Sequence, residues 1–222
     1  MTSANRIEIA YGTGQLTVTL PPEAEPTVIQ KLGMTKIVDP EAAVRDALAH
    51  PIGASGLAQA AEGKQTACIL ICDITRPVPN HLFLRSLIEG LTGAGMPLDG
   101  ISVLVATGLH RPNEGSELRK LVGDDWVLEN VRVENHFARD NAAHVDLGVT
   151  GTRGVPVKLD RRFVEAEVRI ATGLVEPHFM AGWSGGRKVI APGVAHEDTI
   201  RTFHSAKFME DPHAIQCNLA SN

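Results

Sequence analysis

The sequence predicts an α/β fold in which a largely parallel sheet is flanked by helices, with a small β-hairpin at the N-terminus. Two observations predict the sheet. First, from residue 66 onward short apolar segments alternate with segments whose apolar residues recur at helical spacing. Second, the short segments are apolar at almost every position, as expected for strands that are covered on both faces. A third observation predicts the hairpin, because residues 6–19 alternate between apolar and polar side chains around Gly12-Thr13-Gly14. We therefore expect a Rossmann-like arrangement with an added hairpin.

The first helix is predicted over residues 39–50, after a stretch in which prolines disfavour regular structure. Asp39 is a good N-cap residue, and Pro40 suits the first helical position because the N–H that it lacks would be unpaired there. Val44 and Leu48 lie one turn apart and give this helix an apolar side.

Strands and helices alternate along the rest of the chain. Leu84, Leu87, Ile88 and Leu91 recur at helical spacing and predict a helix with one buried stripe. The strands are expected at residues 66–73, 101–108, 131–136, 142–149 and 168–175. The helices are expected at residues 79–91, around 118–122 and at 197–209. Because such alternation is typical of βα units, we expect most of the strands to be parallel.

Composition narrows the class of protein. The chain has 222 residues, of which 43% are hydrophobic and 21% charged, and its formal net charge is -5. These values are ordinary for a soluble globular protein and argue against nucleic-acid binding, which usually needs a basic stripe. The sequence shows neither a bilayer-spanning apolar run nor a signal-peptide pattern. We expect a cytoplasmic protein that binds neither nucleic acid nor membranes, with Cys68, Cys72 and Cys217 as reduced core residues.

Polar side chains follow three of the predicted strands, at the point where each strand ends. Asp73, Thr75 and Arg76 follow one strand, His110 and Arg111 another, and Glu176 and His178 a third, which leads into a loop carrying Lys188. The carboxyl ends of parallel strands meet at one edge of a sheet, where α/β proteins bind their ligands. We therefore expect one site at this edge that contains Asp73, Arg76, His110, His178 and Lys188.

Each of these residues also has a purely structural interpretation. Asp73 could cap the turn before Pro77 with Arg76 as its surface partner, although a guanidinium also suits a phosphate or carboxylate. A single loop histidine is usually structural. Two histidines at matching strand ends, His110 and His178, instead favour proton transfer at a stereocentre, which needs a base on each side.

The stretch from Ser184 to Gly193, SGGRKVIAPG, is similar to a phosphate-binding loop but departs from its pattern. Arg187 separates the second glycine from Lys188, and Val189 stands where a magnesium-binding hydroxyl belongs. The glycines leave room for an anion or a cofactor. Lys188 is then an exposed cation, a nucleophile or a covalent anchor.

His204 lies on the last predicted helix, four residues after Ile200, so its side chain is expected near the buried stripe. It is either a core histidine or a metal ligand. The surrounding sequence contains neither H-E-x-x-H nor a histidine pair, so a conventional zinc site is not predicted. We expect the remaining histidines to be structural: His50, His81, His136, His144, His196 and His213.

Four motifs carry a resemblance to a known family. In chain order they are DITRPVP (73–79), ATGLHRP (106–112), EPHFMAGWSGGRKVIAPG (176–193) and FHS (203–205). They resemble the N-terminal domain of the nickel-dependent lactate racemase family, whose members racemise or epimerise 2-hydroxy acids. The resemblance covers essentially the whole chain. It implies that residues 1–222 form an N-terminal cofactor-binding and catalytic domain and that the family's C-terminal α/β domain is absent from this chain.

The resemblance also implies a cofactor, the nickel-pincer nucleotide, which is a Ni(II) pyridinium-3-thioamide-5-thiocarboxylate mononucleotide. Lys188 would anchor it covalently through a thioamide. His204 would be the single histidine ligand of the nickel, with the other ligands supplied by the cofactor. Asp73, Thr75 and Arg76 would hold the nucleotide. The partners that the family implies are the C-terminal domain and the cofactor-synthesis proteins.

In the mechanism that the resemblance implies, His110 and His178 are the two acid–base residues. One histidine takes the proton of the substrate hydroxyl while the α-hydrogen leaves as a hydride to the cofactor, which gives a planar 2-keto acid. Return of the hydride to the other face inverts the centre, and the second histidine serves the mirror-image substrate. Lactate, malate, aromatic hydroxy acids and sugar acids are all substrates within the family, so the expectation is a 2-hydroxy acid as a class.

Two other interpretations of these residues remain open. A non-catalytic nucleotide- or phosphate-binding module would need no more than the groups of Arg76, Gly185, Gly186 and Lys188. A metallohydrolase would use His110, His178 and His204 as zinc ligands, although no spacing between ligand pairs supports it.

Overall fold

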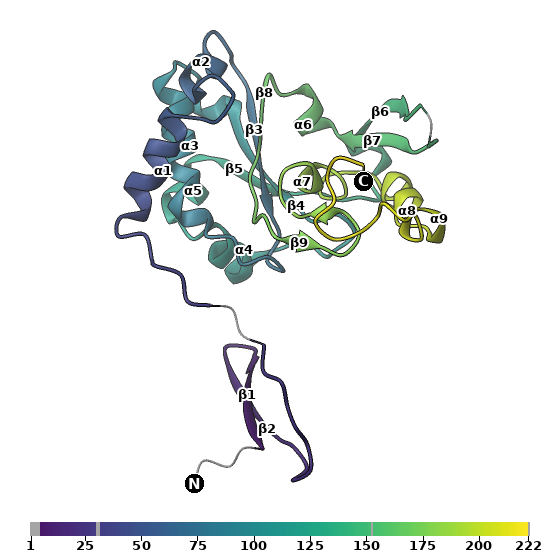
Figure 1. The fold of residues 1–222 in the computed structure, drawn as a ribbon. Coiled ribbons are helices and arrows are strands. Elements are labelled where there is room, and N and C mark those ends of the chain that lie inside the picture. The colour runs from purple at the N-terminus through teal and green to yellow at the C-terminus, as the bar shows by residue number, and fades with distance from the viewer. Residues whose placement is uncertain (1–4, 30–31, 152, 222) are drawn as a thin grey trace. The chain divides into compact units, whose positions relative to one another are not determined.

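The computed structural model describes residues 5–29, 32–151 and 153–221. It divides into two compact units, Met1–Val38 and Asp39–Asn222, each of which is described by itself. In the first unit, β1 (Arg6–Tyr11) and β2 (Gly14–Thr19) pair antiparallel. This is the hairpin predicted from the alternating pattern, drawn in purple in Figure 1.

The second unit is built on a parallel sheet with the strand order β5-β4-β3-β8 (Figure 1). Its strands are β3 (Ala67–Cys72), β4 (Ile101–Ala106), β5 (Arg132–Asn135) and β8 (Val168–Ala171). β3 and β4 are therefore parallel neighbours joined by a long helical connection, as in a βαβ unit. The predicted parallel α/β sheet flanked by helices is confirmed.

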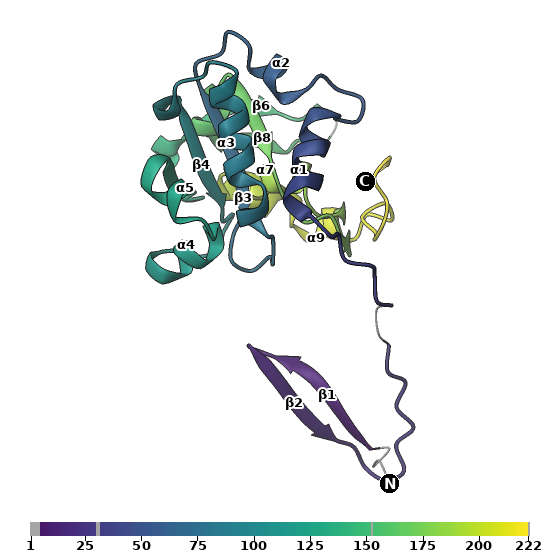
Figure 2. The same ribbon diagram turned by 90° about the vertical axis from the view of Figure 1, so that its left-hand side faces the viewer.

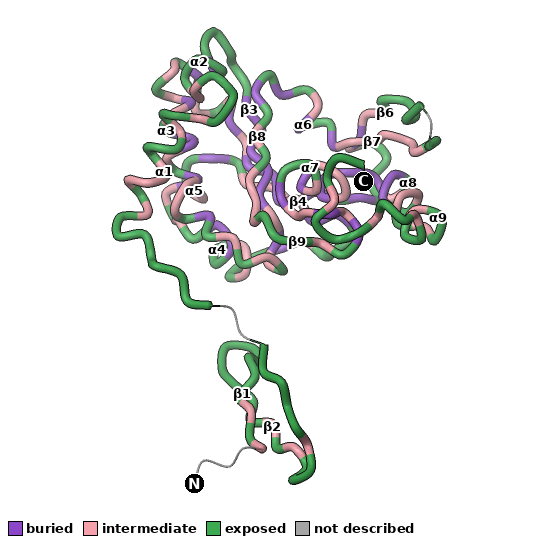
Figure 3. Tube along the Cα trace, viewed as in Figure 1, coloured by how far each residue is buried: buried purple, intermediate pink, exposed green. Residues whose placement is uncertain are grey.

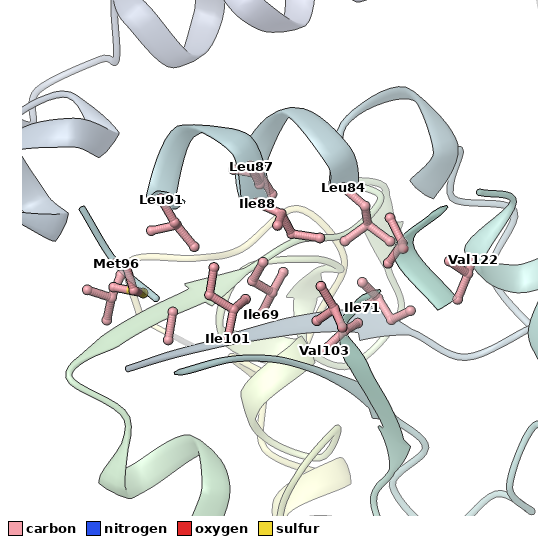
Figure 4. Packing of buried hydrophobic residues seen from close by; sticks show 14 of the residues in the cluster. Ile69, Ile71, Leu84, Leu87, Ile88, Leu91, Met96, Ile101, Val103 and Val122 are labelled. Atoms are coloured by element: carbon pink, nitrogen blue, oxygen red, sulfur yellow. The ribbon is translucent and has the colours of Figure 1, made fainter. Parts of the chain in front are cut away.

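Helices α1 to α5 cover one face of this sheet (Figure 2). They are α1 (Pro40–Ala49), α2 (Leu57–Ala61), α3 (Leu84–Gly93), α4 (Gly115–Val122) and α5 (Asp125–Asn130), with 3-10 turns at Asn80–Leu82, Leu98–Gly100 and Asn141–Ala143. The predicted stripe of α3 is buried and packs on Ile69, Ile71 and Val103 (Figure 4). Helix α1 starts as predicted, because the Asp39 carboxylate accepts a hydrogen bond from the Ala42 N–H at 2.8 Å.

The opposite face has its own core. Cys68 and Leu70 of β3 point to this side and pack with Phe163 of α6 (Arg161–Glu165) and Val189 of α7 (Arg187–Ile190). Figure 3 shows buried residues concentrated along the central strands. Since successive side chains of a strand point to opposite faces, burial on both sides explains why β3 is apolar at every position.

Three predicted elements differ from the structure. Residues 142–149 do not join the parallel sheet: β6 (His144–Val149) pairs antiparallel with β7 (Pro156–Asp160), a strand that the sequence did not reveal. The strand expected at 168–175 ends at Ala171. The helix expected at 197–209 is two helices, α8 (Glu197–Phe203) and α9 (Ala206–Met209), because Ser205 between them has an extended backbone.

Three of the histidines expected to be structural, His136, His144 and His196, form a buried layer beside the antiparallel β6–β7 ribbon. The rings of His136 and His196 each lie 5.0 Å from the ring of His144, edge to face. Both ring nitrogens of His136 face oxygens that only accept: Nδ1 lies 3.1 Å from Oδ2 of Asp160, and Nε2 lies 3.0 Å from the Ala195 carbonyl oxygen. His196 instead accepts at Nδ1 from the backbone N–H of Asp198 and so caps α8.

The cysteines are free thiols, but their burial differs. Cys68 is buried and Cys72 half-buried, whereas Cys217 is exposed, so the expectation of a core position is wrong for Cys217. Within the described parts of the chain, no helix combines the length and the apolar character that crossing a membrane requires.

Truncating the α3 stripe should destabilise the second unit. Ile88 is fully buried against the sheet, so Ile88→Ala is expected to lower the free energy of unfolding by about 2–5 kcal/mol. Ile52 is fully exposed, and Ile52→Ala is the matched control, expected to change it by less than about 0.5 kcal/mol. Urea denaturation at pH 7 measures both, and equal effects of the two changes would contradict the assignment of this core.

Acidification should destabilise the protein through the histidine layer. Burial, and then the neighbouring His136 and His196, lower the pKa of His144 below its ordinary value. Above that ordinary value the ring is neutral in both states, whereas below it the unfolded chain binds a proton that the folded chain excludes. The free energy of unfolding should therefore fall from pH 7 to pH 5, and should fall less in His144→Gln. His50 is exposed, so His50→Gln should keep the full decrease; an unchanged decrease in His144→Gln would refute the effect.

Candidate active site

A cavity of about 640 Å³ lies where β3 and β4 end and their polar loops begin. Six of the seven predicted site residues line it: Asp73, Thr75, Arg76, His110, Lys188 and His204. The loops after β3 and β4 supply the first four, α7 supplies Lys188, and His204 follows α8. The parallel sheet therefore brings together residues that are far apart in the sequence.

His110 is held by a buried carboxylate. Its Nδ1 lies 2.6 Å from Oδ2 of Asp73, whose side chain is only 6% exposed, while 58% of the His110 side chain is accessible. The other Asp73 oxygen accepts a hydrogen bond from the Thr75 hydroxyl at 2.6 Å. Because a carboxylate only accepts, Nδ1 of His110 carries a proton and Nε2 of the neutral ring has a lone pair. The pair can thus orient a general base, with Thr75 fixing the carboxylate.

The glycine loop before Lys188 is a tight turn that bonds to itself. Gly185 and Gly186 have φ angles of 71° and 44°, and a Cβ on Gly185 would lie 3.1 Å from the Leu174 carbonyl oxygen. The N–H groups of Lys188 and Val189 donate to Gly185 and Gly186, so they do not point at a ligand. A phosphate-binding loop instead presents such groups to its anion.

Lys188 is half-buried and lies near a second cation, Arg76. Burial, and then the nearby Arg76 guanidinium, lower the pKa of the Lys188 ammonium below its usual value. A larger share of the amine is therefore neutral near pH 7, and the neutral amine is the nucleophilic form. Val189, buried in the sheet core, fixes the helix that carries Lys188.

His204 ends α8, and its ring Nδ1 donates to the Ile200 carbonyl at 2.9 Å. This bond fixes the tautomer and leaves the lone pair on Nε2, as second partners of metal-binding histidines do. In the described parts of the chain no three His, Cys, Asp or Glu side chains are grouped so as to hold a metal. A metal at His204 would therefore take its other ligands from outside this set of side chains.

His178 lies in a small antiparallel pair formed by β9 (Pro177–His178) and β10 (Gly182–Trp183). It does not line the 640 Å³ cavity, but burial, then Lys188, Arg76 and His204, lower the pKa of its ring. Its Nδ1 accepts from the backbone N–H groups of Met180 and Ala181. The neutral ring therefore carries its proton on Nε2, the opposite of His110.

Other features of this region were not foreseen from the sequence. Arg111 and Glu176, which also follow strand ends, do not line the cavity, and Arg111 pairs instead with Glu117. Thr107 does line it, and its hydroxyl donates to the His136 carbonyl. A second cavity of about 790 Å³ shares Lys188 and His204 with the first, and its apolar wall includes Trp183, Phe203 and Phe208. The three aromatic residues of this second cavity are not regularly spaced in the sequence, so no periodic pattern could have identified them.

The chain is similar to proteins of known family. A family model described as the lactate racemase N-terminal domain matches residues 11–216. The lactate racemase of Thermoanaerobacterium thermosaccharolyticum is 36% identical over 97% of this chain and 50% of its own length. The lactate racemase of Lactiplantibacillus plantarum is 37% identical over 81% of this chain and 42% of its own length. The chain thus spans about half the length of these curated relatives.

Solved structures show the same fold. The lactate racemase apoprotein of Thermoanaerobacterium thermosaccharolyticum superposes with a TM-score of 0.77 at 35% identity, over 96% of this chain and 49% of that one. A protein from Thermotoga maritima has a TM-score of 0.64 at 24% identity, over 80% of this chain and 44% of that one, which speaks for the fold alone. The family match over residues 11–216, together with the identity to curated relatives, shows that this chain belongs to the lactate racemase family and corresponds to its N-terminal domain.

Proposed function

We propose that this chain is the N-terminal, cofactor-binding and catalytic part of a racemase or epimerase of 2-hydroxy acids. The observation that carries the proposal is the shared cavity of His110, held by buried Asp73, with Lys188 and His204. The names of the two curated relatives, both lactate racemases, support it. Because the chain spans about half of their length, the proposed activity belongs to a protein that also has the family's C-terminal domain and is loaded by cofactor-synthesis proteins.

The cavity residues fit a nickel-pincer nucleotide. The neutral fraction of Lys188 suits a covalent bond to the cofactor, and Nε2 of His204 suits one position on the nickel. The described side chains offer no larger metal-binding group, which agrees with a metal whose remaining ligands come with the cofactor. Arg76 and Thr75 would hold the nucleotide. When bound, the group would supply the acceptor and donor of the hydride.

In this proposal, His110 takes the proton of the substrate hydroxyl at Nε2. Asp73 stabilises the imidazolium that forms and keeps the ring in one orientation. The His110 ring bonds to one oxygen of the Asp73 carboxylate, and the Thr75 hydroxyl bonds to the other. Asp73 therefore serves His110 directly, and any contact with the nucleotide would be made through groups other than its phosphate, which a carboxylate repels.

His178 would serve the mirror-image substrate, but it is not equivalent to His110 in this conformation. Its neutral ring offers an N–H at Nε2, because Nδ1 accepts from Met180 and Ala181. To act as a base at Nε2, the ring must release those two backbone groups. Donation of a proton from His178 requires the imidazolium, whose Nδ1–H also displaces those two backbone groups, so either role of His178 would include a rearrangement of the β9–β10 turn.

The activity is tested with full-length protein produced together with the cofactor-synthesis enzymes. We expect nickel-dependent interconversion of the enantiomers of a 2-hydroxy acid, followed by chiral chromatography over a panel of such acids. His110→Gln should lower kcat by roughly 10²–10⁴-fold, since it removes a general base. His50→Gln, at an exposed site, is the control and should have no effect. Nucleotide binding without nickel, and no racemisation, would favour the non-catalytic binding module instead.

The anchor is tested by intact mass spectrometry of the same protein. We expect a mass increase of one cofactor that is lost in Lys188→Arg and kept in Lys120→Arg, since a guanidinium does not form the proposed thioamide bond. Lys120 is exposed on α4 and preserves the same chemical change at a distance from the cavity. An adduct that persists in Lys188→Arg would show that the cofactor is attached elsewhere or not covalently.

A further inference from the structure

Asn113 is a buried polar residue that the proposed chemistry does not use. It follows His110 by three positions and is 1% exposed. Its side-chain oxygen accepts from the Ile74 N–H at 3.1 Å, and its amide nitrogen donates to Glu117 at 3.0 Å. Its backbone N–H and carbonyl bond to the two ends of the Asn135 amide, at 2.8 and 2.9 Å.

These partners allow one orientation of the Asn113 amide. A backbone N–H requires the oxygen at Ile74, and an ionised carboxylate requires the NH₂ at Glu117. Hydrogen bonds from Arg111 and Asn113 lower the pKa of Glu117 to about 2, so it stays an acceptor. Rotating the amide by half a turn would place like groups together on both sides, which makes the contact a fixed link rather than an adaptable one.

The link joins the two loops that carry the proposed base and its carboxylate. Ile74 is the residue after Asp73, and Asn113 belongs to the same loop as His110. Asn135 ends β5, the strand beside β4, and ties this loop to the edge of the sheet. The Asn113 amide thus connects the two loops through hydrogen bonds to groups other than the Asp73 and His110 side chains.

We propose that Asn113 is a positioning residue for the proposed acid–base pair, holding the Asp73 loop against the His110 loop so that His110 keeps its proton on Nδ1 and its lone pair on Nε2. The catalytic role in this inference rests on the proposed function. The tautomer of His110, in contrast, is a property of this chain and can be measured in it alone. Without the link, the 2.6 Å contact to Asp73 relaxes and the accessible His110 ring exchanges its partner for water.

The test compares Asn113→Asp with Asn130→Asp, using nitrogen-15 NMR of the imidazole rings in this chain. Asn113→Asp keeps an oxygen for Ile74 but places a carboxylate against Glu117. Asn130 is exposed at the end of α5, so Asn130→Asp makes the same change in charge away from the link. The His110 signal is assigned by its loss in His110→Gln.

We expect the wild type and Asn130→Asp to show the Nδ1–H tautomer of His110 and Asn113→Asp to lose it. Adding Glu117→Gln to Asn113→Asp should restore the tautomer, because the new amide can donate to the new carboxylate. In the loaded enzyme, Asn113→Asp should lower kcat on the order of tenfold or more with little change in KM, as displaced catalytic groups do.

A folded Asn113→Asp variant with the wild-type tautomer would overturn the proposal. If that variant does not fold, Asn113→Ala decides, because it removes both side-chain hydrogen bonds of the link without placing a second carboxylate against Glu117. An unchanged tautomer in Asn113→Ala would then reduce Asn113 to a structural residue. If the loaded wild-type enzyme shows no racemase activity while Asn113→Asp loses the tautomer, the proposed function is refuted and the positioning role stands.

Discussion

The parallel register of β3 and β4 is the constraint on which the site depends. Cys72, the last residue of β3, lies opposite Ala106, the last residue of β4, so the loops after both strands leave the sheet side by side. Burial of β3 on both faces holds this register, because a slip of one residue would exchange the side chains of the two cores. The Asp73 carboxylate can then meet a histidine 37 positions away in the sequence.

Much of this arrangement could be predicted from the sequence, because it follows from local patterns. The uniformly apolar β3, the stripe of α3 and the cap at Asp39 each have a physical signature within a few residues. The order of the motifs after strand ends predicted a shared site, and six of the seven predicted residues line one cavity.

What escaped prediction depends on contacts between distant segments. The strand β7 is half-buried along most of its length and pairs with β6 in a ribbon whose pattern is weak, so periodicity did not identify it. The break between α8 and α9 depends on the backbone of Ser205. That Asp73 holds His110 is a matter of three-dimensional distance, which no local pattern in the sequence shows.

Helix α8 connects the buried histidine layer to the cavity. His196, in the buried layer, caps the start of this helix, and His204, on the cavity wall, caps its end. At 1.5 Å per residue, its seven residues form a rod roughly 10 Å long between the two. Because the Thr199 hydroxyl of α8 accepts a hydrogen bond from the Lys158 N–H of β7, α8 links the β6–β7 ribbon to the cavity-lining His204.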